Sequence, residues 1–210
     1  MIFLKILLID DHEIFASGLS DSLIKCDTSN TIENIYTITS QTSVDLISEK
    51  ILEMGIDILI IDVNIKKIVE MDGFALFKKI KQKIPYIKTI IITGYDFPLF
   101  EYEAYEIGAS AFIRKETNST EIYNILMSVF NGNRIFKNTT ENLYPLTDRE
   151  KEILALYSNG YTRNDISKKL YISPRTLANH LAKIYEKLDV SNYQEMLLKA
   201  AKLGYIKELL

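Results

Sequence analysis

Residues 1–130 alternate short apolar runs with longer amphipathic stretches, and this alternation constrains the fold more than any other feature. Several runs are apolar without interruption, which is typical of parallel strands covered on both faces. The stretches between them have the spacing of helices with one apolar face. Strand and helix repeated five times predict a doubly wound α/β domain on a five-stranded parallel sheet. The expected strands are Leu4–Ile9, Ile35–Ile38, Ile58–Ile61, Thr89–Ile92 and Ala111–Ile113, and the expected helices are Glu13–Lys25, Ser43–Met54, Gly73–Gln82, Leu99–Ile107 and Ser119–Phe130.

The pattern changes after residue 130. Residues 131–145 lose the periodicity and are rich in Asn, Gly, Thr and Pro, which predicts a linker. Residues 146–210 have only helical patterns and predict a C-terminal all-α domain of four helices. Thr147 and Glu150 have the spacing of a capping box, and Ser173-Pro174 is typical of a helix start. The helices are expected from Thr147 to about Ser158, over Thr162–Leu170, over Pro174–Leu188 and over Ser191–Leu203.

Charge divides the chain in the same way. The whole sequence of 210 residues has a formal charge of −3, which taken alone argues against nucleic-acid binding. Residues 1–145 hold 14 Lys/Arg and 20 Asp/Glu, a net of −6, whereas 146–210 hold 11 and 8, a net of +3. An acidic domain followed by a basic one indicates two separate functions.

Some classes of protein are excluded or disfavoured. Cys26 is the only cysteine, so an intrachain disulfide and a cysteine-based zinc site are excluded. The two histidines, His12 and His180, lie too far apart in the sequence to favour a histidine-rich metal site. The first apolar run is too short for a signal peptide, and no stretch reaches the roughly 18–20 apolar residues of a membrane span. We therefore expect a cytoplasmic protein without membrane association.

Polar residues follow the predicted strands. Asp10 and Asp11 follow the first strand, Asp62 the third, Thr93 the fourth and Lys115 the fifth. The carboxyl ends of parallel strands share one edge of a sheet, so these side chains should meet there. Gathered carboxylates repel unless a cation joins them, and hard oxygen ligands suit Mg²⁺. A carboxylate beside Mg²⁺ can attack a phosphoryl group, while a lysine and a hydroxyl bind its oxygens.

Five segments in order resemble the receiver domain of two-component response regulators. They are ILLIDDHEIFASGL (6–19), DILIIDVN (57–64), MDG (71–73), IIITG (90–94) and GASAFIRKE (108–116). The resemblance covers about 1–130 and implies a flavodoxin-like fold that is phosphorylated on an aspartate. It implies Asp62 as the phosphoacceptor, a Mg²⁺ ion held by Asp11, Asp62 and the backbone carbonyl of Asn64 with help from Asp10, Lys115 as partner of the phosphoryl group, Thr93 as the switch hydroxyl and Phe112 as the switch aromatic.

The sequence departs from that family beside the expected acceptor. Similar domains read Met-Pro-x-Met-Asp-Gly there, with the glycine eight residues after the acceptor. Here Gly73 is eleven residues after Asp62, and Ile65-Lys66 replaces Met-Pro. The loop is thus about three residues longer and carries Lys66 and Lys67, which could alter partner choice or the lifetime of the phosphoryl group. A degenerate receiver that never takes phosphate remains an alternative.

The third helix of the C-terminal domain has one apolar stripe, formed by Leu177, Leu181, Ile184 and Leu188. A shorter helix precedes it, and a tight Tyr-Ile-Ser-Pro connection joins the two. Two helices joined in this way predict a helix-turn-helix, whose second helix can enter the major groove of DNA. Asn side chains can read adenine there, and Arg or Lys can read guanine or bind phosphate.

The stretch 146–192 resembles the LuxR-type DNA-binding domain. The matching residues are Leu146, Thr147, Arg149, Glu150, Gly160, Ile166, Ile172, Ser173, Thr176, His180, Lys187 and Leu188. The resemblance implies that 174–187 is the recognition helix and that the last helix serves as a dimer surface. The candidate DNA contacts are Arg175, Thr176, Asn179 and Lys183, with Arg163, Lys168 and Lys169 near phosphates. Ala178 stands where similar sequences have lysine, so the sequence preference should differ.

Together the two resemblances predict a response regulator of the NarL/FixJ type. A sensor histidine kinase or a small phosphodonor would phosphorylate Asp62. The side chains of Thr93 and Phe112 would then shift, and a homodimer would bind two half-sites of promoter DNA. We do not expect a turnover enzyme, although slow autodephosphorylation is compatible with this chemistry. An aspartyl-phosphate phosphatase would need a second acid two residues after its nucleophile, where this chain has Asn64. A regulator that binds DNA without phosphorylation is the other alternative.

Overall fold

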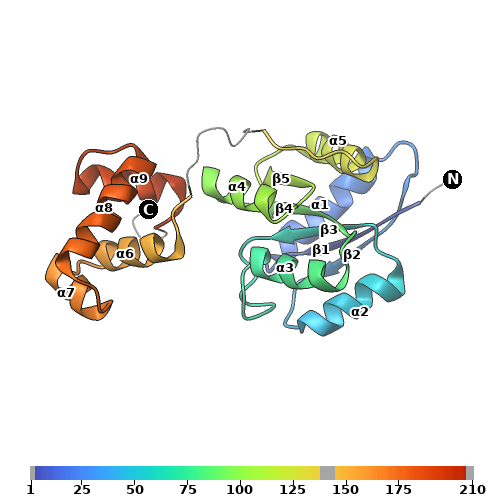
Figure 1. Ribbon diagram of the computed structural model, residues 1–210. Coiled ribbons are helices and arrows are strands. Elements are labelled where there is room, and N and C mark those ends of the chain that lie inside the picture. Colours follow the sequence, from blue (N-terminus) through green and yellow to red (C-terminus); the bar gives the residue numbers. More distant parts are fainter. Residues whose placement is uncertain (1–2, 138–144, 207–210) are drawn as a thin grey trace. The chain divides into compact units, whose positions relative to one another are not determined.

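The computed structural model describes residues 3–137 and 145–206, and the chain divides into two compact units. The first unit is built on a sheet and the second is helical, and each is described by itself (Figure 1). The predicted fold class of both is confirmed. Among the described helices, none is long and apolar enough to cross a membrane.

The first unit alternates strands and helices along the whole of its length. Its strands are β1 (Leu4–Ile9), β2 (Ile32–Ile38), β3 (Ile58–Asp62), β4 (Lys88–Thr93) and β5 (Ala111–Arg114). Its helices are α1 (Glu13–Cys26), α2 (Val44–Met54), α3 (Gly73–Lys83), α4 (Pro98–Glu106) and α5 (Ser119–Phe130). Most of these bounds lie within one or two residues of the predicted ones.

The five strands form one parallel sheet in the order β2-β1-β3-β4-β5. Helices α1 and α5 pack together against one face, and α2 and α3 lie on the other (Figure 1). Along β1, Ile6 and Leu8 belong to the core beneath α1 and α5, whereas the side chains of Leu7 and Ile9 point to the opposite face. All four are fully buried, which explains why the strand sequences are apolar without alternation.

Strand β2 differs from its prediction because it begins at Ile32, three residues earlier than expected. It lies at the edge of the sheet, and every one of its residues is exposed or only partly buried. The polar residues at its start are therefore not desolvated and destabilise the fold little, and the apolar pattern of the central strands is missing there. Edge strands are harder to delimit from hydrophobicity for this reason.

The helical unit consists, in its described part, of α6 (Asp148–Ser158), α7 (Arg163–Lys169), α8 (Pro174–Leu188) and α9 (Tyr193–Leu203). The predicted capping box of Thr147 and Glu150 is present, and Ser173 caps α8 with Pro174 in its first turn. A second capping box joins Thr162 and Asp165 at the start of α7. These caps satisfy backbone N–H groups that a helix start leaves unpaired.

Residues 131–137 lie against the sheet unit. The backbone N–H of Ile135 donates to the Ser110 carbonyl at 2.8 Å, and Ile135 forms a parallel bridge with Ala111 of β5. The Arg134 guanidinium donates to the backbone carbonyls of Ala109 and Tyr105. The first seven residues of the predicted linker therefore pack on this unit, and residues 138–144 lie outside the described part of the chain.

Candidate functional site

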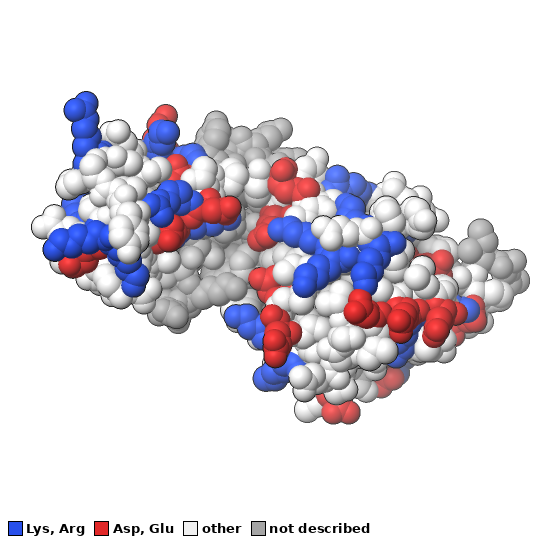
Figure 2. Space-filling view, turned by 60° about the horizontal axis from the view of Figure 1, so that its bottom comes forward, with Lys and Arg blue, Asp and Glu red and all other residues white. Residues whose placement is uncertain are grey.

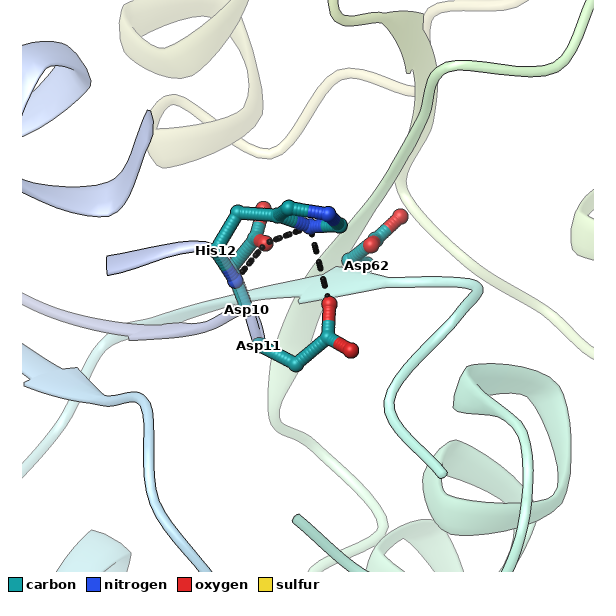
Figure 3. A group of neighbouring side chains, drawn as sticks. All are labelled: Asp10, Asp11, His12 and Asp62. Carbon is teal, nitrogen blue, oxygen red and sulfur yellow. Dashed lines mark hydrogen bonds and ion pairs between the residues drawn. The ribbon is translucent and has the colours of Figure 1, made fainter. Parts of the chain in front are cut away.

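An acidic pocket lies at the carboxyl edge of the sheet, where β1 and β3 end side by side. Asp10, Asp11 and His12 follow β1, and Asp62 is the last residue of β3 (Figure 3). One ligand atom from each of these four residues lies within 4.8 Å of the others. The predicted convergence of the three aspartates is therefore confirmed. The pairing of β1 with β3 brings together residues 52 positions apart in the sequence.

Lys115 joins two of these carboxylates. Its Nζ lies 2.7 Å from Asp10 Oδ2 and 3.0 Å from Asp62 Oδ2. The two carboxylates are almost fully buried, and the ammonium lies 4.6 Å from the centroid of the Phe15 ring. A buried carboxylate needs such a partner, because its desolvation is expensive. Lys115 lies directly after β5, which explains how it reaches the pocket.

Burial and charge shift the titration of this pair. Burial raises the pKa of Asp62 above its ordinary value, although the charge and hydrogen bond of Lys115 act in the opposite direction. Burial lowers the pKa of Lys115, but the hydrogen bond to Asp10 and the charge of Asp62 outweigh it, so this pKa is raised. The lysine therefore stays charged and holds a carboxylate in place beside it.

Asp11 has different partners. Its Oδ1 lies 2.8 Å from His12 Nδ1, and its Oδ2 lies 3.3 Å from Lys67 Nζ. The backbone N–H of His12 donates to Asp10 Oδ1 at 2.9 Å, which fixes the turn that carries the two aspartates (Figure 3). Lys67 comes from the long loop between β3 and α3, so one of the two lysines noted on that loop reaches the pocket. His12 also touches the pocket, through Asp10 and Asp11.

The other predicted pocket residues lie on the neighbouring strands and loop. Thr93 ends β4 and is fully buried, and its Oγ1 accepts the backbone N–H of Tyr95 at 3.2 Å. Phe112 is buried on β5, where it pairs with Ile91 of β4. Asn64 is exposed, two residues after Asp62. The roles of these residues as switch groups and as a carbonyl ligand remain predictions.

Gly73 begins α3 directly beside the pocket. A Cβ at this position would lie 2.2 Å from the backbone oxygen of Asp62. Its backbone N–H also donates to the Val63 carbonyl at 2.9 Å. Only a residue without a side chain lets the helix start this close to the end of β3. The glycine of the Met-Asp-Gly motif thus has a structural reason, because it lets α3 start directly against the Asp62 backbone.

The donor set of the pocket fits a hard divalent cation. Three carboxylates offer oxygen ligands beside the His12 imidazole, and no soft thiolate is close, since the free thiol of Cys26 ends α1. Mg²⁺ uses one or two carboxylates and keeps several waters, so the pocket offers enough ligands.

The predicted helix-turn-helix is formed by α7 and α8. Leu177, Leu181, Ile184 and Leu188 of α8 are buried in the core of the helical unit, as the sequence predicted. The seven candidate DNA contacts are all exposed, and they are Arg163, Lys168, Lys169, Arg175, Thr176, Asn179 and Lys183. Their accessibility permits contact with DNA, and contact itself remains a prediction.

The surface charge of the helical unit is mixed. On the face that Figure 2 shows, its Lys and Arg side chains are interspersed with Asp and Glu. Lys169 stacks on the ring of Tyr161, with Nζ 4.6 Å from the centroid, which orients one of the cations. The Oγ1 of Thr176 lies 2.9 Å from the capping Ser173 Oγ, so this candidate contact also takes part in the helix start. A mixed surface favours local contacts over a strong long-range field.

Two family models match the two units. Residues 6–127 match the response regulator receiver domain, and residues 144–200 match the bacterial regulatory proteins of the luxR family. The chain therefore belongs to the two-component response regulators. Within them it is of the NarL/FixJ type, which joins a receiver domain to a LuxR-type DNA-binding domain.

Relatives agree with this assignment, and a solved structure agrees with the fold. The response regulator VraR of Staphylococcus saprophyticus is 27% identical over 209 residues, which span 94% of this chain and 96% of VraR. The transcriptional regulatory protein DesR of Bacillus subtilis is 36% identical over 125 residues, 57% of this chain and 63% of DesR. A solved RcsB–DNA complex has the same fold, with a TM-score of 0.67 at 21% identity, and the match covers 96% of this chain and all of that one.

Proposed function

We propose that Asp62 accepts a phosphoryl group and that this event controls DNA binding by the helical unit. The observation that carries the proposal is the pocket itself, in which Lys115 lies 2.7 Å from Asp10 and 3.0 Å from Asp62. A lysine with no role in the pocket would not need to be held between two buried carboxylates. A lysine that must later neutralise a phosphoryl group needs to be held at that place beforehand.

The chemistry follows from the positions of the side chains. A carboxylate oxygen of Asp62 attacks the phosphorus of the donor, and the bond from phosphorus to the leaving group breaks with its electron pair. The donor is a phosphohistidine of a sensor kinase or a small acyl phosphate. Lys115, which lies beside Asp62, would pair with a phosphoryl oxygen, and the hydroxyl of Thr93, at the end of the neighbouring strand, would bind another.

A divalent cation belongs to this proposal. Mg²⁺ would be held by the carboxylates of Asp11 and Asp62 and the backbone carbonyl of Asn64, with Asp10 assisting. When bound, it would offset the negative charge that gathers in the pocket. The closeness of the three carboxylates supports this assignment.

The output is DNA binding by a homodimer. The exposed residues of α8, namely Arg175, Thr176, Asn179 and Lys183, are the proposed base and phosphate contacts. Arg163, Lys168 and Lys169 of α7 are the proposed phosphate contacts. RcsB has been solved as two dimers bound to two DNAs, which supports a dimeric mode of binding here. With a net charge of +3 on residues 146–210, one unit alone should bind DNA weakly, and in a dimer on two half-sites the binding free energies of the two units would combine.

The test combines labelling and DNA binding. The full chain is incubated with acetyl phosphate and Mg²⁺, and the mass increase of one phosphoryl group is measured by intact mass spectrometry. We expect labelling of the wild type and none of Asp62→Asn. A DNA fragment selected from a random-sequence pool by the phosphorylated wild type is then titrated at fixed salt, and the phosphorylated wild type should bind it more tightly than Asp62→Asn.

Two results would refute parts of this proposal. Labelling that persists in Asp62→Asn would move the acceptor to another residue. Equal DNA affinity with and without the phosphodonor would favour a regulator that works without phosphorylation. Sustained release of phosphate from a phosphomonoester would instead favour a phosphatase, against which Asn64 argues because it cannot protonate a leaving group.

A further inference from the structure

The loop between β3 and α3, residues 63–72, is a folded structure. The Ile65 carbonyl accepts the backbone N–H groups of Ile68 at 2.9 Å and Val69 at 3.1 Å. Ile65 and Ile68 are fully buried, and the Ile68 carbonyl accepts the N–H of Thr42 at 2.9 Å. The longer loop is therefore anchored by its apolar side chains and by backbone hydrogen bonds to residues outside it, such as the one from Thr42. This anchoring decides which of its polar side chains faces the acidic pocket.

Lys67 is the loop side chain that does so. Its Nζ lies 3.3 Å from Asp11 Oδ2, and the Asp11 carboxylate is only 2% exposed. The lysine side chain itself is 78% exposed, so it has room to move away without unfolding the loop. Lys66, its neighbour, is also exposed and makes no ion pair within the described residues. The two lysines thus differ in their contact with the pocket and little else.

The distribution of charge gives Lys67 a particular position. Lys115 pairs with Asp10 and Asp62, so it leaves Asp11 to other cations. Within the described part of the chain, the ion-pair partners of Asp11 are Lys67 and His12. Asp11 is also one of the proposed ligands of the divalent cation. An ammonium and a divalent cation therefore compete for the same carboxylate, and their positive charges repel each other at close range.

We propose that Lys67 is a tethered competitor of the divalent cation and sets the metal affinity of the pocket. The inference rests on the proposed function, because it concerns the same metal site. Lys67 leaves Asp11 when a divalent cation binds there, and its exposed, four-carbon side chain permits that movement. The longer loop thereby makes phosphorylation more dependent on the concentration of the cation.

The test measures metal binding directly, without phosphorylation. MgCl₂ is titrated into the full chain by isothermal titration calorimetry at low salt, for the wild type, Lys67→Gln, Lys67→Arg and Lys66→Gln. Lys67→Gln should bind Mg²⁺ about three- to tenfold more tightly than the wild type. Removal of a nearby positive unit charge relieves about twice as much Coulomb repulsion for a divalent ion as for a monovalent one. Lys67→Arg and Lys66→Gln should match the wild type. The gain should shrink as salt is added.

Each outcome decides the inference. An equal dissociation constant for Lys67→Gln and the wild type, with clear binding in both, would overturn the role of Lys67 and leave the phosphoacceptor proposal intact. An equal gain in Mg²⁺ affinity in Lys66→Gln would also overturn it. The gain would then come from the loss of any positive charge on the loop and not from competition at Asp11. Binding of Mg²⁺ by none of the variants would overturn it together with the proposed metal site. Labelling of Asp62 remains a separate measurement in every case.

Discussion

Gly73→Ala tests whether the start of α3 really holds the backbone of Asp62. The added Cβ would lie 2.2 Å from the Asp62 carbonyl oxygen, 3.0 Å from its carbonyl carbon and 3.1 Å from Ile61 Cγ2. Two of these three atoms belong to the backbone of a central strand, so they cannot rotate away. The helix must retreat from the sheet by about 1 Å to restore ordinary contact distances.

The cost of this retreat follows from two opposing effects. Overpacking of a core costs about 1–3 kcal/mol, and a clash between backbone segments belongs at the upper end. Alanine offsets at most about 1 kcal/mol, because it is a better helix former than glycine. The net loss in free energy of unfolding should be about 2 kcal/mol, which moves the urea midpoint of the sheet unit down by about 1 M.

The measurement is urea unfolding of the full chain, followed by circular dichroism, with Gly18→Ala as the matched control. Gly18 lies inside α1, and a Cβ there would have no neighbour within 4 Å. That variant should be unchanged or more stable by up to about 1 kcal/mol. Labelling of Gly73→Ala by acetyl phosphate should also slow, because the Asp62 backbone moves. A Gly73→Ala protein with the wild-type midpoint would show that α3 yields freely and that the close approach is unimportant.

Two further predictions concern the helical unit. Glu150 is buried and bonded to Lys187 at 2.7 Å; burial raises its pKa, but the hydrogen bonds of Lys187 and Thr147 outweigh this and hold the pKa below 4.5. This carboxylate stabilises the fold at a pH above its unfolded pKa, and the stabilisation is lost as the pH falls through its folded pKa. Melting temperatures measured from pH 6 to pH 3 should therefore fall less steeply in Glu150→Gln than in the wild type. Glu150→Gln should already be about 2 kcal/mol less stable at neutral pH, and parallel plots of melting temperature against pH would contradict this reasoning. Ala178→Lys should bind promoter DNA about tenfold more tightly and steepen the salt dependence by about one unit, as measured by fluorescence anisotropy at several salt concentrations. An unchanged salt slope would mean that the exposed side chain at position 178 does not face DNA.

Much of the fold was predictable because burial and capping leave clear marks in the sequence. The central strands are buried on both faces and are therefore apolar without alternation, as in residues 58–61 of β3. Helix starts were marked by capping residues such as Ser173 and Thr147, whose side chains accept backbone N–H groups in the structure. The start of β2 was missed because an edge strand with exposed residues has no such mark.

The candidate site was predictable to the extent that topology alone determines it. Parallel strands place Asp10, Asp62 and Lys115 at one edge whatever the details of the loops. The contact of Lys67 with Asp11 was beyond sequence reasoning, because it depends on how Ile65 and Ile68 bury themselves and turn the chain between them. Loop conformation arises from such packing and leaves no periodic signal.

The distance along the chain between Asp10 and Lys115 has a consequence for synthesis on the ribosome. The lysine is made 105 residues after the aspartate that it neutralises, and 53 after Asp62. At about 5–20 residues per second, this delay is about 5–20 seconds. A nascent chain that ends before β5 would have to bury its aspartates without their lysine, at a high desolvation cost. The acidic pocket therefore cannot form, and the protein cannot signal, until the whole receiver domain has been translated.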